Sequence, residues 1–130
     1  MPNTAVNGLV IRPSSRSVDE VVESLRTTLS AKGINLFAFI DHSGEAIKAG
    51  FTMRPTKLFV FGDPRAGTPL MLASITSAID LPLKLLVWQD EQGTTQLAYN
   101  DPTYIGTRHH LPDSLLANIS SIAKLVESLL

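Results

Sequence analysis

The sequence predicts an α+β fold, a mainly antiparallel sheet packed by helices in the order β-α-β4-α. Five short apolar segments are typical of strands, and the last two are joined by a four-residue turn, as in a hairpin. Only one βαβ-like unit is present, which favours this fold over a doubly wound parallel sheet. Short helices are expected after the second and third strands, and a long helix closes the chain.

A proline- and serine-containing break separates the first strand from the first helix. The strand covers about Val6 to Ile11 and is broken at Pro13. Ser17 followed by Glu20 has the spacing of a capping box, which predicts that a helix begins there. Gly33 is a suitable residue to end it. The apolar face of this helix consists of Val18, Val21, Val22, Leu25 and Leu29.

The middle of the chain predicts two strands with a short helix between them. The segment Ile34–Ile40 is apolar and aromatic, and Lys57–Phe61 is the next segment of this kind. Ser43–Ala49 contains alanine and ends at Gly50, which predicts a helix of two turns.

A further helix is predicted to begin at Thr68. Threonine is a good N-cap residue, and Pro69 suits the first helical position. The segment before it is therefore expected to be a loop. The buried side of this helix is predicted to be Leu70, Met71, Ile75, Ala78 and Ile79.

The hairpin and the last helix complete the fold. Leu83–Trp88 and Thr94–Tyr99 flank the turn Asp90–Gly93. Tyr104–His110 is expected to form a short helix or an irregular loop. From Pro112 onwards, apolar residues recur at spacings of three and four, which predicts one long helix that covers a sheet face. These apolar residues are Leu115, Ile119, Ile122, Val126 and Leu129.

The composition limits the class of protein. A chain of 130 residues with 44% hydrophobic residues suits one domain, residues 1–130, with a real core. The net charge is −1 and the basic residues are scattered, so nucleic acid is not an expected partner. The chain has no cysteine, which excludes disulfides and thiolate zinc sites. With no signal-peptide pattern and no long apolar stretch, the expectation is a cytoplasmic protein without a membrane segment or cofactor.

The glycines at positions 62 and 67 have the spacing of a phosphate loop. That motif continues with lysine and then serine or threonine, whereas here Thr68 and Pro69 follow, so a nucleotide triphosphatase is rejected. A weaker hypothesis is an anion on the amides near Thr68, with Arg65 as its partner. The alternative is that Gly62 and Gly67 only make a turn and cap a helix.

Histidines are candidates for acid/base chemistry or metal binding. His42 follows a strand, and His109 follows a loop that contains Tyr104 and Arg108. No metal-ligand spacing is present, so no metal site is predicted. The alternative is that these histidines are hydrogen-bonded structural residues.

Lys84 lies inside an apolar strand. If both sheet faces are partly covered, it needs a carboxylate or an anion, whereas on an open face its stem only covers apolar surface. Asn100, Asp101 and Arg108 are polar residues that follow the end of a strand, where sites are often built. They could equally form a turn and a surface ion pair. A hydrolase triad lacks the G-x-S-x-G pattern.

Six blocks of the sequence, in this order and spacing, resemble the domain-of-unknown-function 302 (DUF302) family, and the likeness extends from about Val10 to the final helix. The blocks are Phe39–His42, Arg54–Leu58, Phe61–Met71, Asp80–Lys84, Tyr99–Pro102 and Arg108–His109. The resemblance implies the β-α-β4-α fold, related in outline to the TATA-binding-protein-like and helix-grip folds, and no established activity. Two departures are Asp63, where the family usually has asparagine, and Glu45, where a small residue is common. The negative charge of Asp63 weakens the case for an anion site. The matching family positions are His42, Gly62, Pro64, Gly67, Thr68, Asp80, Pro82, Lys84, Asn100, Asp101, Pro102 and His109.

Three functions stay open from the sequence. The first is a module that binds a small acidic or amphipathic molecule in a pocket between sheet and helix. The second is an enzyme with His42 or His109 as acid/base and Lys84 as charge stabiliser. The third is a homodimer that associates through an exposed sheet face or helix stripe. The candidate ligand-binding residues are His42, Gly62, Arg65, Gly67, Thr68, Lys84, Asn100, Asp101, Arg108 and His109.

Overall fold

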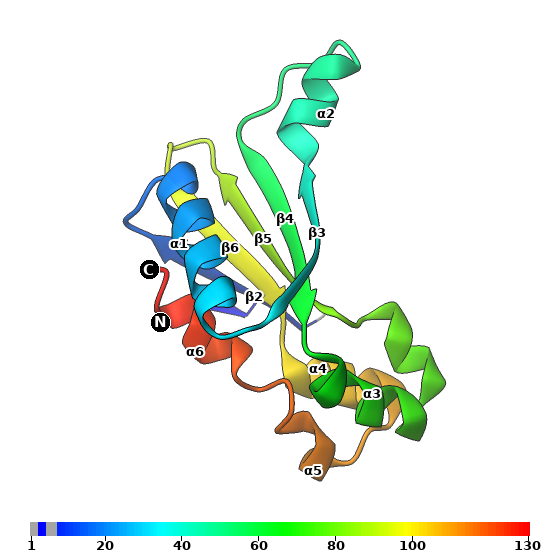
Figure 1. Cartoon of the computed structure of the whole chain (residues 1–130). Helices are drawn as coiled ribbons and strands as arrows, with labels where there is room; N and C mark the ends of the chain where they lie inside the picture. The colour runs from blue at the N-terminus through cyan, green and yellow to red at the C-terminus, as the bar shows by residue number, and fades with distance from the viewer. Residues whose placement is uncertain (1–2, 5–7) are drawn as a thin grey trace.

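The computed structural model describes residues 3–4 and 8–130 and contains a six-stranded sheet with strand order β1-β2-β6-β5-β4-β3 (Figure 1). Every neighbouring pair is antiparallel, which confirms the α+β class and the mainly antiparallel sheet. The strands are β1 (Asn3–Thr4), β2 (Leu9–Ser14), β3 (Asn35–Asp41), β4 (Thr56–Gly62), β5 (Leu83–Gln89) and β6 (Thr95–Asn100). The helices are α1 (Val18–Ala31), α2 (His42–Lys48), α3 (Pro64–Ala73), the 3-10 helix η2 (Ile75–Ile79), α4 (Pro102–His109), α5 (Asp113–Leu116) and α6 (Ile122–Glu127).

The first strand differs from its prediction at both ends. Its predicted start, Val6, lies outside the described residues, and β2 continues through Pro13 to Ser14. The two-residue strand β1 pairs only with Val10 and Ile11, so Pro13 lies where β2 is the edge of the sheet. An edge tolerates proline because no hydrogen bond to its missing N–H is required there.

Helix α1 has the caps that the sequence predicts. The Ser17 hydroxyl accepts from the Glu20 amide, and the Glu20 carboxylate accepts from the Ser17 amide. At the other end Gly33 has φ +65°, and the amide of Ile34 reaches back to the Leu29 carbonyl. This is a Schellman ending, which satisfies carbonyls that would otherwise lack partners.

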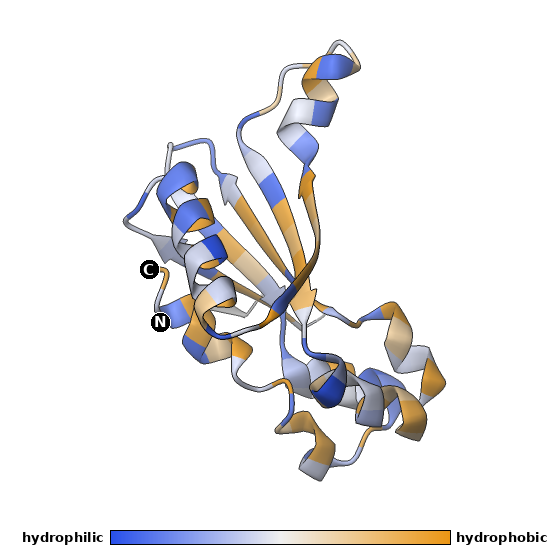
Figure 2. Ribbon diagram, in the orientation of Figure 1, coloured by the Kyte–Doolittle hydropathy of each residue, from blue (hydrophilic) through white to orange (hydrophobic). Residues whose placement is uncertain are grey.

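Helices α1 and α6 cover one face of the sheet, and the larger core lies between them and the strands (Figure 1). In Figure 2 apolar residues run along the strands, and the polar face of α1 points outward. A second, smaller core lies in a lobe below the sheet, built around α3, α4 and the segment before α6. Its buried members are Leu70, Leu81, Ile105, Leu111 and Ile119.

The predicted start of α3 is wrong. The helix begins at Pro64, with Asp63 as its N-cap, so Thr68 and Pro69 lie inside it. Asp63-Pro64 is an equally good cap-and-proline pair, and it directly follows the end of β4. The predicted buried side is also wrong beyond Leu70 and the partly buried Met71. The chain is extended at Ser74, which turns the following residues outward, and those left exposed are Ile75, Ala78 and Ile79.

The C-terminal segment is not one long helix but two short ones, α5 and α6. The break falls at residues 117–121, where polar side chains bond to backbone. The Ser120 hydroxyl donates to the Leu116 carbonyl, and Asn118 donates to the carbonyl of Ala66 in α3. The bond from Ser120 is local and competes with the helix, and the bond from Asn118 ties the break to α3. The predicted apolar stripe stays largely buried, with Ile119 in the smaller core and Ile122 and Val126 in the larger one. The uncertain segment Tyr104–His110 falls largely in α4, capped by Asp101.

Candidate functional site

A mostly apolar groove of about 490 Å³ lies at the seam between the two cores. Its walls come from the ends of β4 and β5, from α3, and from the stretch that leads into α6. Lys32 and Ile34, which follow α1, and the edge strand β3 close one side. The main apolar lining residues are Ile34, Phe37, Phe61, Met71, Leu83 and Ile122.

A few polar groups sit among the apolar walls. Lys32, at the C-terminal end of α1, makes no ion pair within the described chain. Asp63 is bonded to the side chain and the amide of Arg65, which keeps its pKa below the usual value. Lys32 is therefore the lining group that is available to an anionic ligand.

Three of the predicted site residues, Gly62, Gly67 and Thr68, line this groove. Arg65 does not, because its guanidinium is exposed and paired with Asp63 at 3.0 Å. The amides near Thr68 are internal to α3, so they do not form the predicted helix start. The argument for an anion at Thr68 and Arg65 therefore loses its physical basis.

His42 and Lys84 lie away from the groove. His42 is the exposed first residue of α2, in the arm at the top of Figure 1. Lys84 is the cross-strand partner of Val60 on the sheet face opposite α1, and its ammonium donates to the Pro82 carbonyl at 3.4 Å. The structure therefore does not bring these two groups to one cavity.

The remaining predicted residues belong to the end of β6 and to α4. Asn100 ends β6, and Asp101 accepts from the Thr103 amide as the N-cap of α4. Arg108 pairs with Asp80, which also bonds the buried ring of His109. Asp101 and Arg108 thus have the structural partners that the alternative hypothesis predicted.

Asp41, next to His42, is the strongest electrostatic feature of the arm. Its carboxylate accepts from the Lys57 ammonium at 2.8 Å, the Ser43 hydroxyl at 2.7 Å and the Gly44 amide at 2.9 Å. These bonds, led by that from Lys57, hold the pKa of Asp41 well below its usual range. Protonating Asp41 therefore costs more in the folded state than in the unfolded state.

The free energy of unfolding should therefore fall as the pH drops below about 4, where the carboxyl protonates in the unfolded chain. We expect Asp41→Asn to be less stable than the parent at pH 7 and to lose less further stability between pH 4 and 2.5. Urea unfolding at each pH measures this. Asp113→Asn, at an exposed carboxylate, is the control and should follow the parent curve. An unchanged acid response in Asp41→Asn would contradict the assignment.

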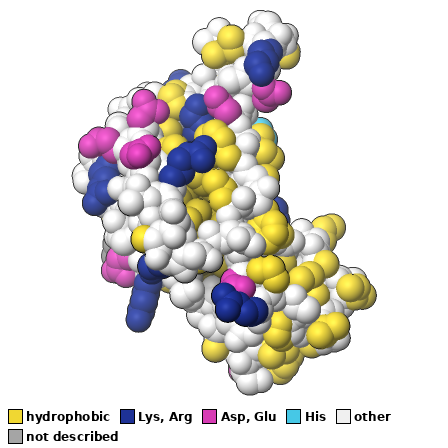
Figure 3. Space-filling model, viewed as in Figure 1, with side chains coloured by type: hydrophobic (Ala, Val, Ile, Leu, Met, Phe, Trp, Pro, Cys, Tyr) yellow, Lys and Arg dark blue, Asp and Glu magenta, His cyan; other side chains and the backbone are white. Residues whose placement is uncertain are grey.

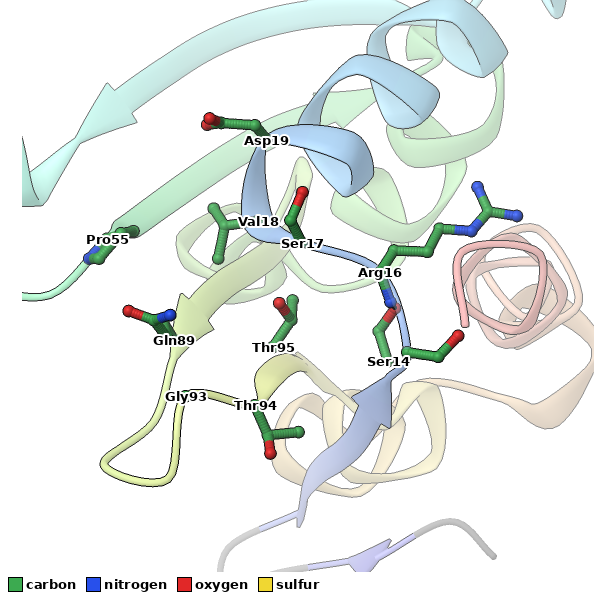
Figure 4. A pocket seen from close by; sticks show the side chains of 11 residues that line it. Ser14, Arg16, Ser17, Val18, Asp19, Pro55, Gln89, Gly93, Thr94 and Thr95 are labelled. Atoms are coloured by element: carbon green, nitrogen blue, oxygen red, sulfur yellow. Dashed lines mark hydrogen bonds between the residues drawn. The ribbon is translucent and has the colours of Figure 1, made fainter.

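A second hollow, of about 560 Å³, lies where α1 begins, between the ends of β2 and β6 (Figure 4). Its lining mixes polar and apolar residues and includes the buried hydroxyl residues Ser14 and Thr95. The Ser14 hydroxyl donates to the Leu129 carbonyl at 2.8 Å, so it ties the C-terminal segment to the sheet. Sequence reasoning missed this hollow, because its residues form no motif.

None of the helices in the described residues is both long and apolar enough to cross a membrane. Nor does this part of the chain bring together three or more histidine, aspartate or glutamate side chains that could hold a metal ion.

The chain is similar in sequence and in fold to known proteins of one family. The model of the "Domain of unknown function DUF302" family matches residues 10–129. The crystal structure of an uncharacterized conserved DUF302 protein from Bacillus stearothermophilus has the same fold, with a TM-score of 0.77. That protein is 20% identical in sequence, and the match covers 97% of each chain.

Curated relatives are longer proteins. "Fluoride-specific ion channel FluC 1" of Brucella suis biovar 1 (strain 1330) is 39% identical over 105 residues, which are 81% of this chain and 41% of that protein. "Fluoride-specific ion channel FluC 2" of Brucella melitensis biotype 1 (strain ATCC 23456 / CCUG 17765 / NCTC 10094 / 16M) has the same identity over 39% of its length. The chain thus spans about two fifths of these relatives. The family match over residues 10–129 shows that the chain belongs to the DUF302 family.

Proposed function

We propose that this domain binds a small amphipathic molecule with an anionic end in the groove between the sheet and α3. The observation that carries the proposal is the groove itself, whose volume of about 490 Å³ lies within the range of small-molecule sites. Such sites combine apolar walls with a few polar groups, as this groove does.

The lining suggests how a ligand would lie. The apolar body would pack between Phe61, Leu83 and Ile122, which come from the sheet and from α6. The anionic end would lie near Lys32, the lining cation without an ion pair. Because the negative end of the α1 dipole is close by, a ligand carrying a single charge is better suited than a polyanion.

Gly67 offers a direct test of the groove. A Cβ added at Gly67 would meet only the Met71 methyl, at 3.9 Å, so there is room for a side chain at this position in the groove lining. We expect Gly67→Leu to weaken binding of the fluorescent anion 8-anilinonaphthalene-1-sulfonate by about tenfold, which is about 1.4 kcal/mol. Fluorescence titration measures this.

Gly67→Ala is the matched control. It removes the same helical glycine, which favours the helix, but adds only a methyl group, so the affinity should stay near that of the parent. Lys32→Gln should weaken the anionic probe but not its uncharged analogue N-phenyl-1-naphthylamine. If Gly67→Leu and the parent bind the probe equally while circular dichroism is unchanged, the groove is not the binding site.

A second candidate function is self-association through the open face of the sheet. The strand residues of the large core all lie on the face that α1 and α6 cover. On the opposite face the cross-strand neighbours include the half-buried Leu58 and Leu86 and the buried Ala98. The other apolar members of this face are Ile11, Ile40, Val60 and Trp88.

The size of this open face suits a second copy. Five strands spaced about 4.8 Å apart, each about 20 Å long, present roughly 500 Å² per chain. Two copies packed face to face would bury about 1,000 Å², which is near the lower bound for a specific interface. The charged strand residue on this face is Lys84. Two copies packed through the apolar centre of the face would therefore experience little charge repulsion.

Leu86→Glu should convert a dimer to a monomer in sedimentation velocity, since the interface would bury a carboxylate among apolar side chains at its centre. Leu72→Glu places the same charge on a different apolar surface, on α3, and should leave the dimer intact. A parent protein that stays monomeric at millimolar concentration would exclude this candidate without affecting the ligand-binding proposal.

A further inference from the structure

A row of hydrogen-bonded side chains, separate from the groove, joins η2 to α4. The Thr76 hydroxyl lies 2.9 Å from Nδ1 of His109, and Nε2 of the same ring contacts the Asp80 carboxylate. Arg108 donates to both oxygens of Asp80, at 3.1 and 3.2 Å. The His109 side chain is 4% exposed, whereas Thr76 lies at the surface.

The partners decide which ring nitrogen carries the proton. Arg108 pairs with the Asp80 carboxylate, and an ionised carboxylate can only accept hydrogen bonds, so Nε2 of His109 must donate to it. In the neutral ring Nδ1 then has a free lone pair, and it accepts the hydroxyl proton of Thr76. This arrangement of hydroxyl, base and orienting carboxylate is the one that activates a nucleophile.

An apolar surface lies beside this hydroxyl. Ile75 and Ile79 flank Thr76 on η2 and are 76% and 70% exposed, and Leu72 on α3 is 83% exposed. In a 3-10 helix residues three apart share a face, so Ile79 lies on the same side as Thr76. Figure 3 shows hydrophobic side chains gathered over the lobe that holds α3 and η2. Exposed apolar patches of this kind usually mark an interaction site.

We propose that Thr76 is a nucleophile that takes an acyl group from a carboxylic ester, with His109 as its general base and Asp80 as the residue that positions the ring. The Thr76 oxygen forms a bond to the ester carbonyl carbon while its proton passes to Nδ1 of His109. The bond to the alkoxy group breaks, and the alkoxide leaves with that proton as the alcohol. Water then releases the acid by the same route and restores Thr76. The aliphatic side chains beside Thr76 favour an ester with a short aliphatic acyl group.

The test uses p-nitrophenyl butyrate and the full chain. We expect release of p-nitrophenol together with the mass of one butyryl group on the peptide that contains Thr76. Thr76→Ala removes the nucleophile and should abolish the mass gain, and His109→Gln should slow the initial release by about a hundredfold, the order of a general-base contribution. Thr76→Ser should retain both, because it keeps the hydroxyl. Ser74→Ala is the control and should also retain both, although the Ser74 hydroxyl lies 3.4 Å from that of Thr76.

If the row had only a structural role, the parent would gain no butyryl group, and the variants would differ from it in stability alone. Thr76 is exposed, so Thr76→Ala should fold normally, and His109→Gln keeps a polar side chain in the buried position without a base. Acylation should disappear in the first variant and slow in the second, while circular dichroism stays unchanged in both. The proposal is overturned if the parent gains no butyryl group, if the label lies on another residue, or if Thr76→Ala is labelled as fast as the parent.

Discussion

Phe59→Ala should destabilise the fold by about 3 to 5 kcal/mol, the range for removing a large aromatic side chain from a core. Phe59 is fully buried in β4, which pairs with β3 on one side and β5 on the other. Its ring meets the edge of Phe39 with centroids 4.9 Å apart, and the Arg26 guanidinium lies 5.6 Å from its centre. The substitution therefore leaves a cavity and removes aromatic contacts.

Urea unfolding measures this loss, and Phe51→Ala is the matched control. Phe51 follows α2 and is 70% exposed, so the same deletion there should change the free energy of unfolding by less than about 0.5 kcal/mol. Equal losses in the two variants would contradict the placement of the core between α1 and the sheet.

Gly8→Ala should have the second large effect. The free energy of unfolding should fall by about 3 kcal/mol. Gly8 has φ +76°, a conformation that costs an L-residue about 1 to 2 kcal/mol. A Cβ at this position would also lie 2.2 Å from Cγ and 2.3 Å from Cβ of Tyr104. These atoms form the base of the side chain in α4, so the helix itself would have to shift. The Gly8 carbonyl accepts from the Asp101 amide at 2.8 Å, which fixes the approach of the two segments.

Gly33→Ala separates the backbone cost of a positive φ from the cost of the contact with Tyr104. Gly33 has a similar φ of +65°, but a Cβ there would meet no atom within 4 Å. It should therefore show only the backbone cost, and the difference between the two variants measures the contact with Tyr104. If both variants lose the same stability, that contact does not constrain the fold.

The sequence predicts correctly those structural elements whose signals lie in neighbouring residues. The capping box at Ser17, the apolar face of α1 and the turn between β5 and β6 depend on neighbouring residues, and the structure confirms them. The start of α3 was mistaken because two cap-and-proline pairs lie five residues apart. Asp63-Pro64 and Thr68-Pro69 carry the same local signal, and only the end of β4 decides between them.

The candidate sites are formed by residues from distant segments, so most of their residues could not be predicted from the sequence. The groove joins Lys32, Phe61 and Asn118 from distant segments, and no spacing links them. Its one linear signal was the pair of glycines at positions 62 and 67, which do line it. The row that contains Thr76 has no sequence signal for the same reason, and only its member His109 is predicted as a candidate site residue.

The two separate cores have a consequence for motion. Leu83 packs against both clusters, and the groove that it lines follows the boundary between them. Regions with their own apolar cluster often open as independent cooperative units, well below the energy of global unfolding. A molecule held at this boundary would touch both units and so raise the cost of opening either one. Amide hydrogen exchange in the lobe would then slow in step with occupancy, even at residues that the ligand never touches.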